Sequence, residues 1–64
     1  MAGYGWSYLV VTQAGAGGEL RAGDGGSFAT EAEMLRELGV TGWELVAVRE
    51  TAGTVVYYFK RSRS

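Results

Sequence analysis

Three segments rich in β-branched and aromatic residues, with one short helical pattern among them, limit the folds open to this chain. The segments are residues 6–12 (WSYLVVT), 43–50 (WELVAVRE) and 54–61 (TVVYYFKR), and their composition favours strands. Only residues 51–53 join the last two, which predicts an antiparallel hairpin. The helical pattern lies between the first and second segments, so the expected order is β-α-β-β.

The helix is expected to begin after Thr30 and to run for about eight residues. Thr30 and Glu33 have the spacing of a capping box, in which each side chain bonds a free backbone amide at the start of a helix. Gly39 is expected at the left-handed position that ends the helix, with Val40 packing on Leu35. The apolar side chains share one arc of the helix: Met34, Leu35 and Leu38.

Glycine dominates the segment between the first strand and the helix. Six of the thirteen residues at 14–26 are glycine, and such composition favours a loop over regular structure. We expect a flexible loop that can be shortened without loss of folding, because the entropy of loop closure changes slowly with length. A short hairpin arm at residues 19–22 is the alternative. The tail at residues 62–64 is expected to fray.

These elements predict a single α+β domain over residues 1–64, a three-stranded antiparallel sheet with one helix packed on one face. A helix returns the chain, so the first and second strands should run in the same direction. The third strand is therefore expected between them, giving the order 1-3-2, with 3-2-1 as the alternative. The expected core contains nine residues: Leu9, Val11, Leu35, Leu38, Trp43, Leu45, Val55, Tyr57 and Phe59.

Apolar residues alternate onto both faces of all three strands. An antiparallel sheet with one solvated face is normally polar on that face, and one short helix covers only one side. The uncovered side would expose a larger apolar patch than monomers usually carry. We therefore expect a homo-oligomer, a dimer or a tetramer, with another protein as a further possible partner. The expected interaction surface is Trp6, Tyr8, Val10, Val56 and Tyr58.

The composition excludes several kinds of chemistry. The 64 residues include no cysteine and no histidine, which removes disulfides, thiolate nucleophiles and the commonest general base. We expect no enzyme, no cofactor and no metal site. The chain shows no secretory signal and no apolar run long enough to span a membrane, so the expected location is the cytoplasm, away from membranes.

Two neighbouring residues are candidates for a functional role. Glu44 could be a carboxylate with a raised pKa beside an indole, but a solvent-facing glutamate opposite Lys60 or Arg61 is the favoured interpretation. Trp43 could stack on a ligand. A tryptophan that opens a strand after a helix more often fills the seam between helix and sheet, and Trp43 is interpreted in that way.

The C-terminal strand holds a cluster of basic and aromatic residues, which in other proteins stack on single-stranded nucleic acid and neutralise its phosphates. This favours weak binding of single-stranded nucleic acid as an alternative function. The acidic pI of about 5.2 and the formal net charge of -1 make nucleic acid a disfavoured partner. The candidate patch is Tyr57, Tyr58, Lys60, Arg61 and Arg63.

The segments LGVTGWELVAV (residues 38–48) and VVYYFKR (residues 55–61) resemble the small bacterial family described as domain of unknown function 4177. That family shares a leucine and a glycine, two variable positions, then G-W-E-L-V, and ends in an aromatic-F-K-R strand. The opening WSYLVV also fits, and only the glycine-rich segment departs from the pattern. The resemblance implies a small sheet crossed by one helix. It implies no activity and supplies no catalytic residue.

Overall fold

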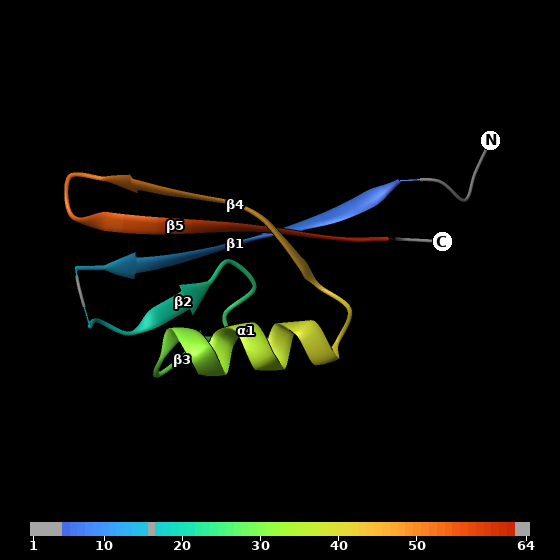
Figure 1. Ribbon diagram of the computed structural model, residues 1–64, viewed down its shortest axis with the longest axis horizontal. Helices are drawn as coiled ribbons and strands as arrows, with labels where there is room; N and C mark the ends of the chain where they lie inside the picture. The colour runs from blue at the N-terminus through green and yellow to red at the C-terminus, as the bar shows by residue number, and fades with distance from the viewer. Residues whose placement is uncertain (1–4, 16, 63–64) are drawn as a thin grey trace.

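A computed structural model of the protein describes residues 5–15 and 17–62. These residues form one sheet and one helix, with the long strands running along the longest dimension of 42 Å (Figure 1). The elements in chain order are β1 (Trp6–Ala14), β2 (Leu20–Ala22), β3 (Ser27–Phe28), α1 (Glu31–Val40), β4 (Glu44–Thr51) and β5 (Thr54–Ser62).

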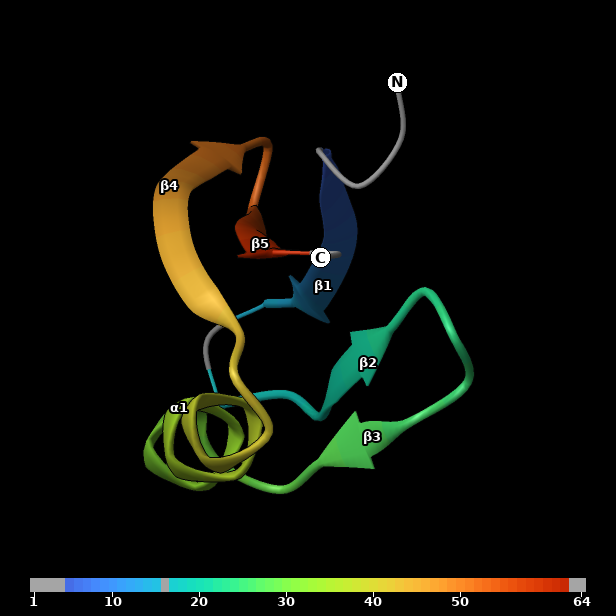
Figure 2. The ribbon, with the colours of Figure 1, turned by 90° about the vertical axis from the view of Figure 1, so that its right-hand side faces the viewer.

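The sheet has five strands in the order β3-β2-β1-β5-β4, and every neighbouring pair is antiparallel. The expected three-stranded sheet is therefore wrong, although the three long strands do lie in the expected order, with β5 between β1 and β4. The sheet curls so that α1 lies beneath it, between β4 on one side and the β2–β3 hairpin on the other (Figure 2).

The glycine-rich segment supplies the two additional strands. β2 pairs with β1 through Val11, Thr12 and Gln13, and its other edge pairs with β3. Leu20 in β2 is completely buried, so the expected dispensable loop over residues 14–26 is also wrong, and the hairpin arm was the better alternative. Ser62, expected in a frayed tail, pairs with Trp6 at the end of β5, and residues 63–64 lie outside the described residues.

The start of α1 confirms half of the expected capping box. The backbone amide of Glu33 donates to Thr30 Oγ1 at 3.1 Å, as the spacing predicts. The carboxylate of Glu33 accepts from the amide of Ala29 at 3.1 Å, one residue before the cap. Both bonds satisfy amide groups at the N-terminal end of α1, where an acidic side chain is also favoured by the helix dipole.

The end of α1 lies three residues beyond the expected position. Gly39 is still helical, and Gly42 takes the left-handed conformation, with φ of 95°. The amide of Trp43 donates to the carbonyl of Leu38 at 2.9 Å, and the amide of Gly42 donates to the carbonyl of Gly39 at 3.1 Å. These two bonds form a Schellman motif. Trp43 therefore follows Gly42 as the residue that turns the chain from α1 into β4.

The two glycines should respond to alanine in opposite directions. Gly42→Ala is expected to lower the free energy of unfolding by about 1 kcal/mol, because φ of 95° is strained for a residue with a Cβ atom. Gly39→Ala is expected to raise it by about 0.5–1 kcal/mol, because Gly39 is helical with open space at its Cβ position. Urea unfolding of both variants measures the difference. The opposite order of stabilities would place the helix end at Gly39.

The core lies between α1 and the side of the sheet that faces it. Five expected core residues are buried there, and Trp43 and Val55 pack against them half-buried. Leu35 and Leu45 are wrong predictions, since they are 39% and 38% exposed. Leu35 is rotated by about 100° from Met34 and about 60° from Leu38 around the helix axis. Leu45 lies on the edge strand β4, where nothing covers it fully. The buried residues are Leu9, Val11, Leu20, Met34, Leu38, Tyr57 and Phe59.

Candidate interaction surface

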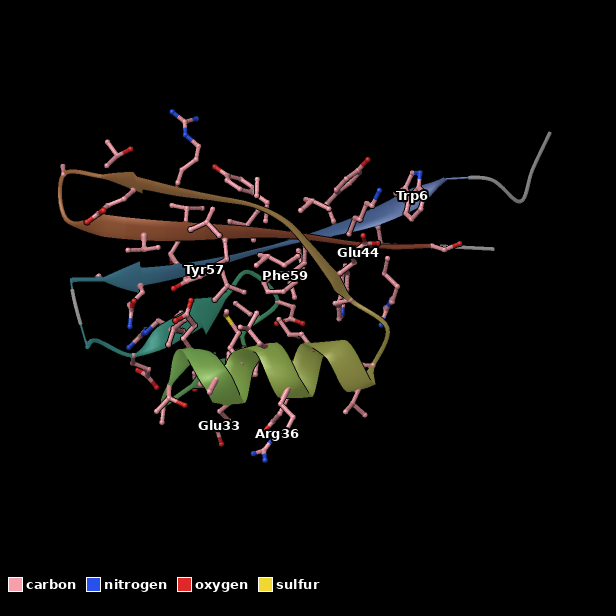
Figure 3. All side chains as sticks on the ribbon, in the orientation of Figure 1. Trp6, Glu33, Arg36, Glu44, Tyr57 and Phe59 are labelled. Carbon is pink, nitrogen blue, oxygen red and sulfur yellow. The ribbon has the colours of Figure 1, made fainter. Side chains whose placement is uncertain are left out.

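The register of β1 and β5 sorts their side chains onto two faces. Leu9 opposes Phe59 and Val11 opposes Tyr57, and all four are buried on the side of α1, here called the inner face. Figure 3 shows Tyr57 and Phe59 between the sheet and the helix. The alternate residues form the outer face, which faces away from α1: Trp6, Tyr8, Val10, Val56 and Tyr58.

The outer face consists of the five residues that the sequence predicts as an interaction surface, and these residues are neighbours in space. Val10 lies directly opposite Tyr58, and Tyr8, two residues from Val10 along β1, is the next residue on the same face. Tyr8 is 70% exposed, and Trp6 and Val10 are 47% and 39% exposed. A strand that presents two aromatic side chains and a valine to water on one face is a feature of interaction sites more than of monomer surfaces.

Charged side chains frame this apolar surface. Lys60 opposes Tyr8 on one side and Glu44 of β4 on the other. The ammonium group of Lys60 lies 4.2 Å from the centre of the Trp6 ring, a cation–π distance. Arg49 of β4 opposes Val56. The outer face is therefore apolar along β1 and β5, with charges of both signs along β4 and at one end.

The basic-aromatic patch expected on β5 is divided between the two faces, because successive residues of a strand point in opposite directions. Tyr58 and Lys60 belong to the outer side, whereas Tyr57 and Arg61 lie on the inner side. Arg63 lies outside the described residues. The five residues of the expected patch therefore do not form one surface in the part of the chain that the structure describes.

The two inner members of that patch have structural partners. Tyr57 Oη donates to Glu31 Oε2 at 3.1 Å, and burial, this hydrogen bond and the charge of Glu31 together raise the pKa of Tyr57. Arg61 Nη1 donates to the carbonyl of Thr41 at 3.0 Å, and its guanidinium lies 4.3 Å from the centre of the Trp43 ring. Both side chains thus tie β5 to the ends of α1.

Trp43 occupies the seam between α1 and the sheet. Its ring is half-buried, packs against the core and carries Arg61 on one face. This agrees with its interpretation as a residue that joins helix to sheet. The guanidinium already stacks on the ring, so a ligand that stacked there would have to displace Arg61.

The acidic residues and surface hollows of the described part of the chain lie apart from the outer face or at its edge. No group of three Asp, Glu, His or Cys residues among them lies close enough to hold a metal ion. Glu44 is exposed on β4 opposite Lys60, as its favoured interpretation requires. Two shallow hollows lie beside the β2–β3 hairpin and beside the first turns of α1, where Glu33 and Arg36 point away from the sheet (Figure 3).

Comparison of the chain with protein-family models, curated proteins and solved structures finds no match. The resemblance to domain of unknown function 4177 therefore stays a prediction. The helix in the described part of the chain, α1, has ten residues and is too short to cross a bilayer.

Proposed function

We propose that this protein is a non-catalytic module that associates with further copies of itself through the outer face of its sheet. The observation that carries the proposal is the exposure of Tyr8, Trp6 and Val10 along one strand, next to Val56 and Tyr58 of β5. Burial of exposed apolar area stabilises association by roughly 25 cal/mol per Å² before entropy is subtracted.

A second copy is the partner that fits this surface best. The face is apolar, so an identical face complements it, as in the two-fold dimers that dominate homo-oligomers. The formal net charge is only -1, so two copies repel each other weakly. Association also compensates for size, because one core in a chain this short contributes only about 3–5 kcal/mol. The absence of cysteine is compatible with work in a reducing compartment such as the cytoplasm.

Replacing Tyr8 with glutamate tests the proposed contact. Tyr8→Glu is expected to weaken association at least about tenfold, because it removes the aromatic contact and because taking a carboxylate out of water is costly even opposite Lys60. Sedimentation across a dilution series measures the effect. Ala32→Glu is the matched control, because it adds the same charge at an exposed position of α1.

Two results would contradict self-association through this face. One is a wild-type chain that sediments as a monomer at micromolar concentration, with a melting temperature that does not change on dilution. The other is equal behaviour of Tyr8→Glu and Ala32→Glu. Subunit binding stabilises the folded state by mass action, so a real contact makes the melting temperature depend on concentration.

A second candidate, weak binding of single-stranded nucleic acid, is favoured by one observation. Trp6, Tyr8 and Lys60 lie together on the open outer face, and exposed aromatics beside a lysine can stack on bases. Glu44 opposite Lys60 weakens this candidate. Anisotropy of a labelled single-stranded oligonucleotide separates the two functions. Binding that falls steeply with salt and is lost in Tyr8→Glu favours nucleic acid, and no binding favours self-association alone.

A further inference from the structure

The strand β4 forms an open edge of the sheet. Within the described residues it pairs only with β5, and all eight of its residues are exposed. Leu45, Val46 and Val48 contribute apolar surface there, each at least 38% exposed. The outward N–H and C=O groups of an uncovered edge strand are a template for pairing with another strand. At the other edge, by contrast, β3 is only two residues long.

A bulge divides β4 and controls which residues share a face. Leu45 opposes Phe59 and Ala47 opposes Tyr58, which leaves Val46 as the extra residue. Before the bulge, Glu44 faces the outer side opposite Lys60. After it, Arg49 faces the same side opposite Val56. Glu44 and Arg49 thus share the outer side although they are five positions apart, which an unbulged strand does not allow.

The same shift places two apolar side chains together on the inner side. Leu45 opposes Phe59 and Val48 opposes Tyr57, and both partners on β5 are buried under the sheet. On either side of the bulge, β4 therefore presents one charged residue outward and one apolar residue inward. The two charges have opposite signs, so β4 is complementary to a second β4 that runs antiparallel to it.

We propose that β4 pairs antiparallel with β4 of a second copy, about a two-fold axis between Val46 and Ala47. Glu44 then opposes Arg49 of the second copy, twice, and Leu45 opposes Val48 of the second copy, twice. The two bulges face each other, so each strand has its extra residue at the same place and the register is kept on both sides of the bulge. Residues on the outer side of one copy then oppose residues on the outer side of the other. This deepens the proposed self-association, on which it rests, by naming a second contact between copies.

Other registers are less favourable for reasons that the same alternation supplies. An axis through Arg49 sets two guanidinium groups against each other, and like charges directly opposite destabilise a sheet. With an axis through Ala47, Arg49 would pair with Leu45 of the second copy, although their side chains point to different sides of the sheet. With an axis through Val48, Leu45 would pair with Thr51 of the second copy, and these side chains also point to different sides. Bulges and charges usually protect an edge from pairing. Here they still allow one register, in which residues 44–49 of the two copies pair with each other.

The size of the outer face explains why a second contact is useful. Three strands of about nine residues cover roughly 30 Å by 15 Å, or about 450 Å² per copy. Two such faces together bury less than the ~1,200 Å² at the lower end of stable interfaces. Edge pairing lies in the plane of the sheet and leaves the outer face free. The two contacts together would join four copies.

Reversing the charges tests the register. Arg49→Glu is the main variant, because Arg49 opposes the neutral Val56 within its own chain. It sets Glu44 against a glutamate at both ends of the pairing and is expected to weaken edge association about tenfold. Glu44→Arg should do the same, although its arginine also meets Lys60, so melting curves must show that it folds. An equimolar mixture of the two variants restores both opposite-charge pairs and is expected to recover wild-type association.

The matched controls make the same charge changes on α1. Arg36→Glu and Glu37→Arg alter exposed residues of the helix and should leave sedimentation unchanged, alone or mixed. The chain has no cysteine, so a register can also be read by oxidation. A mixture of Glu44→Cys and Arg49→Cys is expected to form a crosslinked pair faster than either variant alone or than a mixture with Thr51→Cys.

The outcomes separate this contact from the outer-face contact. If Arg49→Glu halves the size of the assembly and Tyr8→Glu halves it independently, both contacts exist. If Arg49→Glu behaves like Arg36→Glu, or if the crosslink shows no preference for 44 with 49, edge pairing is overturned while the outer-face dimer stands. The edge would then be open to an extended segment of another protein. If only Tyr8→Glu lacks effect, the edge contact stands and the outer-face contact fails.

Discussion

Leu20→Ala is expected to reduce the free energy of unfolding by about 2–5 kcal/mol, the usual range for truncating a buried leucine. Leu20 is completely buried and packs in the core although it comes from a three-residue strand. One core of this size contributes only about 3–5 kcal/mol. The expected loss is therefore comparable with the stability of one copy, and part of the variant should be unfolded at room temperature.

Leu45→Ala is the control for this substitution. It removes the same atoms from a leucine that is 38% exposed at the sheet edge and is expected to cost less, because less area returns to water and the open edge leaves no enclosed cavity. Urea unfolding of both variants at one protein concentration gives the comparison. If both variants lose the same free energy of unfolding, or if Leu20→Ala is as stable as wild type, β2 does not contribute to the core and three strands are enough to form it.

The missed strand shows how little sequence signal a short buried strand carries. Leu20 stands between Glu19 and Arg21, an alternation that fits a strand but spans only three residues. Glycines on both sides favour a loop, and they are in fact used in the turns: Gly25 has φ of 104° and its amide donates to the carbonyl of Ala22 at 3.0 Å. Burial of Leu20 depends on β1 and α1, which are contacts that local composition does not record.

The helix ends show where local rules suffice and where they do not. The cap at Thr30 depends on residues within one turn, and it was predicted correctly. At the C-terminal end of α1, two glycines, Gly39 and Gly42, could each take the left-handed position that ends a helix. The choice of Gly42 lets the amide of Trp43 reach the carbonyl of Leu38 and lets the Trp43 ring pack against the core, whereas Val40 is 82% exposed.

Strand alternation predicted which residues share a face, although not which of the two faces α1 covers, and it argued against the basic-aromatic patch. Trp6, Tyr8 and Val10 share parity on β1, so they had to lie on one face once β1 was extended. On β5, Tyr57 and Arg61 differ in parity from Tyr58 and Lys60. Because successive residues of a strand point to opposite faces, these residues could not all belong to one patch. The bulge in β4 could not be expected, because its position depends on pairing with β5.

The two faces of β5 should separate folding from assembly. Phe59→Ala is expected to lower the free energy of unfolding by about 3–5 kcal/mol at every protein concentration, because Phe59 is 2% exposed between α1 and the sheet and leaves a cavity when truncated. Its neighbour Tyr58 points to the outer face, opposite Val10. Tyr58→Ala is expected to leave each copy folded and to weaken association.

Melting curves over a dilution series distinguish these effects. For Phe59→Ala, the loss of stability should appear even at the highest concentration, because mass action cannot restore contacts within one chain. For Tyr58→Ala, the melting temperature should approach that of wild type under dilution, where both chains are monomers. If Phe59→Ala instead matched the dilute wild type and Tyr58→Ala unfolded at all concentrations, the assignment of inner and outer faces would be reversed, and α1 would have to cover the face of Tyr8 and Tyr58.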